Sequence, residues 1–307
     1  MLGVSERLSP ATLKLFAKSA AALGSLRDAQ GARADQGIAV SLTRISAAVR
    51  AAAFQARSLR TNDPSLKSLQ IQGRKVVVSI DGGRIRIRCN KKGPKTDKNR
   101  TRYSTEWREP KLLCIDFLDE NGDIDRTIPP VLDGTMAHVD EIFRMLCVYL
   151  AMMPMDSETE VLFISDGADC LWKQVHLVEN TVREKGGRFR CLLDDYHMKG
   201  YLHDMATAAK DGTQKKRTQW IRRLTEFLFA DDNAAFEREV QLLQKGSRKG
   251  TILRTAGNDL LKHSRTGHMN YAKARERKFP IGSGVIESTI RLMLCVRCIL
   301  PKIPNRR

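Results

Sequence analysis

Apolar residues recur at helical spacing in the first part of the chain. Segments 9–23 and 38–54 place apolar side chains three or four positions apart in an Ala-rich background, which is typical of amphipathic helices. This pattern predicts a small helical unit over residues 1–68. Two short helices around the turn-prone segment 31–37 also fit a helix-turn-helix that binds DNA, although plain packing is the commoner role of Ala-rich helices.

From residue 74 onward the pattern changes to that of strands. The β-branched run 74–81 (RKVVVSID) is followed by the turn-forming pair 82–83 (GG) and by 84–89 (RIRIRC), which alternates basic and apolar residues. A period of two on either side of a glycine turn is typical of a hairpin. The segment 74–89 therefore predicts an antiparallel hairpin with one positively charged face.

Strands and helices alternate in the middle of the chain. After the basic, polar segment 91–109, the run KLLCIDFLDE at 111–120 predicts a third strand that ends at the Asn-Gly-Asp turn 121–123. The elements expected next are a helix over 138–153, a buried strand over 160–166, a helix over 169–185, a strand over 188–194 and a helix from His197. The predicted order is therefore βββαβαβα.

This order predicts a single sheet. A strand, a helix and a parallel strand connect by a right-handed crossover, so the fourth and fifth strands extend the sheet beside the first. We expect an α/β fold over residues 69–307, with a mixed five-stranded sheet of the ribonuclease H (RNase H) type. A densely charged stretch without strand signal predicts a helical insertion at about 203–275, before the Pro/Gly loop 279–284 and a final helix near Val285.

Composition places the chain among globular proteins of a reducing compartment. The 307 residues are 42% hydrophobic and 29% charged, with no apolar run that could span a bilayer and no secretory leader. The seven cysteines are odd in number and scattered. Cys295 and Cys298 have zinc-type spacing, but no second pair lies near them, so helix packing explains these thiols better. We expect a cytoplasmic protein without a membrane partner.

The charge of the chain predicts a polyanionic partner. Lys and Arg number 53 against 35 Asp and Glu, which leaves a net charge of +18, and ten basic residues fall within each of the segments 84–108 and 265–307. Such clusters release counterions from phosphates whatever the base sequence. Nucleic-acid backbone is therefore the expected target, with a solvated basic surface or a membrane-facing patch as the alternative. The expected DNA contacts are Arg84, Arg86, Arg88, Lys91, Lys92 and Arg291.

Three carboxylates lie where regular structure ends or begins. Asp81 closes the first predicted strand, Asp166 closes the fourth, and Glu287 falls in the first turn of the final helix. If the first and fourth strands are neighbours, the two aspartates emerge side by side at the edge where open α/β sheets place their sites. A helix packed across this edge brings Glu287 to them.

Converging carboxylates need a counter-charge, because three of them cannot all stay ionised together. Mg²⁺ or Mn²⁺ is the natural occupant, since hard divalent cations prefer oxygen ligands. Two such ions activate a water or a 3′-hydroxyl on one side of a phosphodiester and stabilise the leaving oxygen on the other. Asp81, Asp166 and Glu287 are therefore the candidate catalytic and metal-binding residues.

Each carboxylate also has a structural explanation. Asp81 precedes two glycines and fits a hairpin turn, while Asp166 fits a cap of the following helix. Glu287 favours a helix N-terminus through the helix dipole. Only the joint placement of the three residues favours catalysis.

Other residues have open roles. The segment 194–197 (DDYH) fits either a contact to a scissile phosphate or an extra metal, or the capped start of a helix. Trp107, Trp172 and Trp220 fit packing in the core or at its edge. Trp220 alternatively stacks on an unpaired base at a DNA end.

The segments around these carboxylates resemble the bacterial insertion-sequence transposases with a DDE catalytic core, most closely the Kra-type family. The matching segments are 79–84 (SIDGGR), 165–168 (SDGA) followed by Trp172, 193–197 (LDDYH) followed by 201–202 (YL), and 279–288 (FPIGSGVIES). The resemblance implies an RNase H-like fold with an insertion between the second Asp and the Glu. It implies that Asp81, Asp166 and Glu287, which are 85 and 121 residues apart, form the triad.

The resemblance also implies the activity and its partners. Members of this family cut and join DNA at transposon ends, so double-stranded DNA is the expected partner and two Mg²⁺ or Mn²⁺ ions are the expected cofactor. Pairing of two DNA ends favours a homodimer on DNA. Two alternatives of other classes remain: a structure-selective nuclease of the same fold without strand transfer, and a catalytically inactive DNA-binding remnant.

The end of the sequence departs from the family. After Ile290 the chain continues as RLMLCVRCILPKIPNRR, in which Pro301 and Pro304 break the expected basic amphipathic helix. This departure is typical of a truncated or frameshifted copy. The chain is also short at its start for a family that often carries zinc-binding and helix-turn-helix modules there.

Overall fold

The computed structural model of the chain describes residues 8–23, 25–60, 64–97, 99–209, 213–246 and 251–284. The chain divides into two compact units. Residues 1–67, 82–110 and 287–307 belong to the first unit, and residues 68–81 and 111–286 belong to the second.

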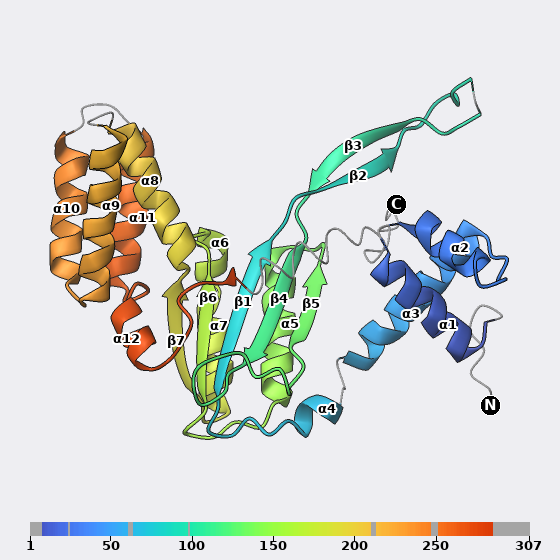
Figure 1. Cartoon of the computed structure of the whole chain (residues 1–307), viewed down its shortest axis with the longest axis horizontal. Coiled ribbons are helices and arrows are strands. Elements are labelled where there is room, and N and C mark those ends of the chain that lie inside the picture. Colours follow the sequence, from blue (N-terminus) through green and yellow to red (C-terminus); the bar gives the residue numbers. More distant parts are fainter. Residues whose placement is uncertain are drawn as a thin grey trace. The chain divides into compact units, whose positions relative to one another are not determined.

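Helices form the N-terminal part of the first unit. They are α1 (Pro10–Ala22), α2 (Leu26–Ala34), α3 (Leu42–Arg60) and α4 (Pro64–Lys67) (Figure 1). Ser9 and Ser25 cap α1 and α2, because each hydroxyl accepts a hydrogen bond from a backbone N–H in the first turn. Two small apolar clusters join α1, α2 and α3. The helices predicted over 9–23 and 38–54 are therefore present.

A two-stranded ribbon makes up the rest of the described part of the first unit. β2 (Ile85–Asn90) pairs antiparallel with β3 (Tyr103–Arg108) along the whole length of both strands. The prediction that 84–89 pairs with 74–81 was wrong. The true partner, YSTEWR, has no alternation of apolar and polar residues, so its strand character was hidden within the polar segment.

A mixed five-stranded sheet forms the centre of the second unit. Its strands are β1 (Lys75–Gly82), β4 (Lys111–Phe117), β5 (Val131–Thr135), β6 (Glu160–Ser165) and β7 (Arg188–Leu193). They lie in the order β5-β4-β1-β6-β7 (Figure 1). β1, β6 and β7 are parallel, whereas β5 is antiparallel to β4. The Leu118 N–H donates to the Lys75 carbonyl, so the end of β4 lies beside the start of β1, as in an antiparallel pair.

The predicted α/β fold with a mixed five-stranded sheet is confirmed, but one strand differs. β4 occupies the place beside β1 that was predicted for 84–89, and β5 occupies the edge place that was predicted for 111–120. Its sequence VLDGT is short and contains Asp and Gly, which are depleted in strands, so only its pairing with β4 identifies it. The predicted extension of the sheet beside the first strand is confirmed by the parallel pairs β1–β6 and β6–β7.

Helices pack on both faces of this sheet. Between the strands lie α5 (Val139–Met152), α6 (Asp169–Trp172) and α7 (Val175–Glu184). Phe143 of α5 packs against Phe163 of β6, with ring centroids 6.0 Å apart. Leu162 and Ile164 point to the opposite face, because successive strand residues alternate, and there they join a second apolar cluster. The helix predicted over 169–185 is interrupted at residues 173–174.

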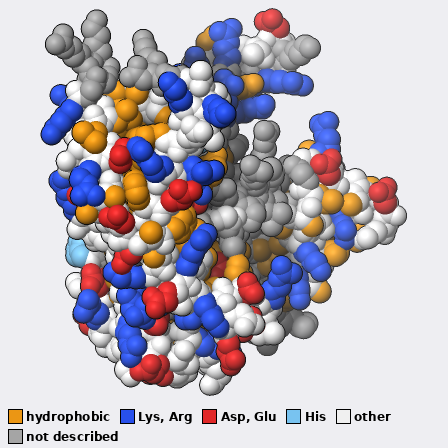
Figure 2. All heavy atoms as spheres, turned by 60° about the vertical axis from the view of Figure 1, so that its left-hand side comes forward, with side chains coloured by type: hydrophobic (Ala, Val, Ile, Leu, Met, Phe, Trp, Pro, Cys, Tyr) orange, Lys and Arg blue, Asp and Glu red, His pale blue; other side chains and the backbone are white. Residues whose placement is uncertain are grey.

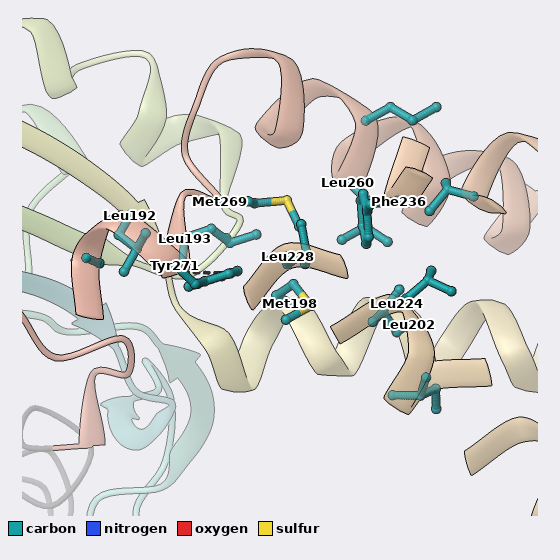
Figure 3. Packing of buried hydrophobic residues seen from close by; sticks show 14 of the residues in the cluster. Leu192, Leu193, Met198, Leu202, Leu224, Leu228, Phe236, Leu260, Met269 and Tyr271 are labelled. Carbon is teal, nitrogen blue, oxygen red and sulfur yellow. Dashed lines mark hydrogen bonds between the residues drawn. The ribbon is translucent and has the colours of Figure 1, made fainter. Parts of the chain in front are cut away.

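The second cluster connects the sheet to the helical part of this unit. The described helices after β7 are α8 (Asp195–Ala208), α9 (Gln214–Phe229), α10 (Asn233–Gly246), α11 (Thr251–Arg265) and α12 (Tyr271–Glu276). Leu193, Met198, Leu228 and Tyr271 are buried together in it (Figure 3). The Tyr271 hydroxyl donates to the Leu193 carbonyl at 3.0 Å, which joins α12 to the end of β7. Within the described ranges, no helix is both long and apolar enough to cross a bilayer.

Candidate active site at the carboxyl edge of the sheet

Asp81 and Asp166 come directly after the last paired positions of two neighbouring parallel strands. The last paired positions of β1 and β6 are Ile80 and Ser165, and each aspartate is the next residue. The Ser165 hydroxyl donates to the Ile80 carbonyl at 2.8 Å, which fixes this register at its end. Because partners in a parallel pair share a face and adjacent strands are about 4.8 Å apart, this register predicts that the two carboxylates emerge near each other.

The loop after β6 is held by short local contacts. The Asp166 side chain accepts a hydrogen bond from the Ala168 N–H at 2.9 Å. Gly167 lies so close to the Tyr201 hydroxyl of α8 that a Cβ at this position would clash with it. Burial and then nearby carboxylates, chiefly Asp259, raise the pKa of Tyr201 to about 12. Tyr201 therefore stays a neutral phenol beside the loop.

Trp172 connects the Asp166 loop to the helical part of the unit. Its indole N–H donates to the Asp166 carbonyl at 2.6 Å. Its ring stacks on His268 at 4.2 Å between centroids and contacts His263 of α11 edge-on at 4.9 Å. The two histidines face each other through their Nδ1 atoms at 3.1 Å. Trp172 thus packs at the edge of the core, as expected, and also fixes the backbone beside Asp166.

The histidine pair predicts a loss of stability in weak acid. Burial lowers the pKa of His263 and His268 to about 4, so the folded protein holds both rings neutral. The unfolded chain binds protons below pH 6.5, and the stabilising contribution present above that pH is lost as the pH falls toward 4.

Urea unfolding of the full chain at a series of pH values measures this effect. The His268→Phe variant keeps an aromatic ring against Trp172 but removes one titrating group. The free energy of unfolding of the wild type should fall more steeply than that of the variant between pH 6.5 and 4. Parallel pH profiles for the two proteins would contradict the buried, neutral histidine pair.

Asp194 adds a third carboxylate at the same edge, but both of its oxygens already accept hydrogen bonds. It follows β7 and lies opposite Asp166, since Ser165 pairs with Leu193. It is 1% exposed, and one oxygen accepts the N–H groups of residues 196 and 197, so it caps α8. The other oxygen accepts both the N–H and the hydroxyl of Ser283. Of the two roles left open for the segment 194–197, the structure supports the capped helix start.

The contact between Asp194 and Ser283, which we call the Asp194–Ser283 latch, holds the Gly-Ser-Gly loop at the sheet edge. The Ser283 N–H lies 2.5 Å from the Asp194 carboxylate. The Asp195 N–H also donates to the Ile281 carbonyl at 3.0 Å. The latch therefore fixes residues 281–283 one strand away from Asp166.

A cavity of about 440 Å³ lies on the same sheet face as Asp81. Its lining includes Ser79 of β1, Asp116 of β4 and Ser283. Asp116 is 4% exposed and accepts a hydrogen bond from the Cys114 thiol at 3.0 Å. Burial raises the pKa of Asp116, which favours the neutral carboxyl. Asp116 was not among the predicted site residues, although an acidic residue within an apolar strand is a visible signal of a special environment.

The basic residues predicted to bind DNA belong to the first unit. Those described lie on or beside the ribbon, and all are exposed: Arg84, Arg86, Arg88, Lys91 and Lys92. Over much of the face presented in Figure 2, Lys and Arg side chains are instead interspersed with Asp and Glu. The run of basic residues on the ribbon is therefore a local feature.

Several predicted residues lie outside the described ranges. These are Glu287, Arg291, Cys295 and Cys298. Among the residues that the structure does describe, no three His, Cys, Asp or Glu side chains form a group that could hold a metal ion. Comparison with models of protein families and with curated proteins gives no match.

Proposed function

We propose that this protein is a DNA transposase with an RNase H-like catalytic core, which cleaves and transfers DNA strands at the ends of an insertion sequence. The observation that carries the proposal is that Asp81 and Asp166 directly follow the last paired residues of two neighbouring parallel strands, at the carboxyl edge of the sheet. The strand order β5-β4-β1-β6-β7 is compatible with the RNase H-like fold that the motifs imply. The net charge of +18 favours a nucleic acid as the substrate.

The Asp194–Ser283 latch supports a role for Glu287 in the same site. Ser283 is bound to Asp194, which lies opposite Asp166. Glu287 follows four residues later in the sequence. The proposal takes it as the third carboxylate of the triad.

The side chains at this edge fit a hard divalent cation. Asp81 and Asp166 offer carboxylate oxygens about one strand spacing apart, and Glu287 would supply a third carboxylate. When bound by these residues, Mg²⁺ or Mn²⁺ ions supply the Lewis acidity that activates a water or 3′-hydroxyl and stabilises the leaving oxygen of a phosphodiester.

The other residues of the site hold the backbone around the two aspartates in place. The Ser165 hydroxyl fixes the register of β1 and β6, and the Trp172 indole fixes the Asp166 backbone. Asp194 holds the loop that leads to Glu287. Because catalysis depends on orienting the reacting groups before the reaction, these contacts keep the two aspartates aligned while DNA binds. The exposed arginines of the ribbon hold the DNA phosphates.

This proposal places the protein in the bacterial cytoplasm, on the nucleoid, with a homodimer pairing two DNA ends. The direct test uses the full chain with labelled transposon-end DNA, with Mg²⁺ or with EDTA, and scores both nicked strands and products joined through a 3′-hydroxyl. The transposase should give both products with Mg²⁺ and neither with EDTA. Cut products alone would indicate a nuclease. Binding without either product would indicate an inactive remnant, and both of these outcomes would overturn the proposal.

A further inference from the structure

The ribbon of the first unit has two chemically different faces. The register places Arg86 opposite Trp107 and Asn90 opposite Tyr103, with Arg88 between them on the same face. We call this the aromatic face. The opposite face carries, in order along both strands, Ile85, Ile87, Cys89, Ser104, Glu106 and Arg108.

The aromatic rings are unusually exposed. Trp107 is 60% exposed and Tyr103 is 49% exposed. The prediction that Trp107 packs in the core or at its edge was wrong, because its strand belongs to a ribbon and not to the main sheet. Trp220, for which stacking on a base was the alternative, is instead partly buried against the helical cluster.

Guanidinium groups line the same face as the rings. Arg84 and Arg86 lie 5.8 and 6.0 Å from the centre of the Trp107 ring, and Arg88 lies 4.6 Å from that of Tyr103. These are cation–π contacts, in which the ring face attracts the positive charge. The aromatic face therefore alternates positive charge with flat apolar surface.

The tip of the ribbon carries further positively charged residues. Its described basic residues are all exposed: Lys91, Lys92, Lys95, Arg100 and Arg102. The Lys91 N–H donates to the Arg102 carbonyl at 2.8 Å, which continues the strand pairing past β2 and β3. On the opposite face, by contrast, Arg108 is paired with Glu106 at 3.1 Å. Positive charge thus exceeds negative charge on the aromatic face and at the tip.

We propose that the aromatic face of the ribbon binds unpaired nucleotides of a DNA strand. Trp107 and Tyr103 stack on the bases, and Arg84, Arg86 and Arg88 bind the phosphates. The chemistry is complementary, since a single strand presents both anionic phosphates and flat base faces, and stacking on aromatic side chains tolerates any base. From the proposed function, this inference takes only that the polyanion is DNA.

A duplex makes a poorer match to the same face. Its bases are stacked on each other, so a protein in the major groove meets their edges and reads them through hydrogen bonds. The widely spaced rings of Trp107 and Tyr103 offer little to base edges. Affinity for a duplex should therefore come from the phosphates and depend on the arginines and lysines alone.

The test is fluorescence anisotropy of a labelled single strand and of the matching duplex, titrated with the full chain in EDTA. Trp107→Ala should weaken single-strand binding by roughly 5- to 100-fold, the loss typical of one stacked base, and change duplex binding little. Trp107→Phe should retain most of the affinity because it retains a ring. Single-strand DNA should also quench the tryptophan fluorescence of the wild type more than that of Trp107→Phe.

Arg86→Ala and Arg108→Ala are a matched pair, because each removes one positive charge from a different face of the ribbon. Arg86→Ala should weaken single-strand binding more than Arg108→Ala does. An equal loss on both DNA forms with Trp107→Ala would overturn the proposal in favour of a groove contact. Unchanged single-strand binding would also overturn it. Because EDTA excludes catalysis, these results are independent of whether the protein cuts and joins DNA.

Discussion

Asp81→Asn should lower Mg²⁺-dependent nicking of transposon-end DNA by roughly 100-fold or more, since metal-ion catalysis supplies several kcal/mol to the transition state. Asn is nearly isosteric with Asp, so the end of β1 and its pairing with β6 should persist. The substitution removes one of the two carboxylates that lie opposite each other at the sheet edge. Asp166→Asn should have an effect of the same size. The measurement is the initial rate of nicking of a labelled end substrate.

Asp204→Asn is the control for loss of a carboxylate. Asp204 is an exposed residue of α8, and its replacement should leave nicking unchanged. DNA binding in EDTA should be similar for all three variants, because the ribbon is untouched. Undiminished nicking by Asp81→Asn would remove Asp81 from the catalytic site.

The second large effect is on stability, through the Asp194–Ser283 latch. Asp194→Ala removes a nearly buried carboxylate that accepts hydrogen bonds from the first turn of α8 and from Ser283. We expect a loss of about 3 kcal/mol or more in the free energy of unfolding, because a helix cap is lost and several buried donors lose their acceptor. Urea unfolding of the full chain measures it.

A double-mutant cycle separates the latch from the cap. Asp194→Ala and Ser283→Ala should be coupled by about 1–3 kcal/mol, as expected for residues in one hydrogen-bond network. Asp232→Ala is the matched control, because Asp232 accepts the N–H of Ala235 at the start of α10 but is exposed. Its cost should be about 1 kcal/mol. Additive effects of the Asp194 and Ser283 substitutions would contradict the latch.

The main sheet could be predicted from the sequence where its strands have strong apolar runs. β1, β4, β6 and β7 each match a predicted strand, and the crossover rule placed β6 and β7 correctly. The pairing of 84–89 was predicted wrongly because alternation shows that a segment is a strand but does not identify its partner. β3 and β5 were missed because neither has a clear period, and long-range pairing decided their structure.

The candidate site, like the sheet, could be predicted only where a local pattern in the sequence indicates it. The positions of Asp81 and Asp166 follow from strand ends, which the sequence shows directly. The roles of Asp194, Trp172 and the two histidines depend on contacts between segments that are far apart in the chain, such as the 89 residues between Asp194 and Ser283. Such contacts leave no local pattern. The motif 193–197 indicated that this segment has a role in the site but did not identify that role.

The most direct test of the account is whether Asp81 and Asp166 bind a divalent cation together. Electron paramagnetic resonance titration of Mn²⁺ into the full chain measures this without DNA and without catalysis. Either Asp→Asn variant should weaken binding by roughly tenfold or more, the double variant should add little, and Asp204→Asn should match the wild type. Wild-type affinity in the Asp81→Asn/Asp166→Asn double variant would contradict the central claim.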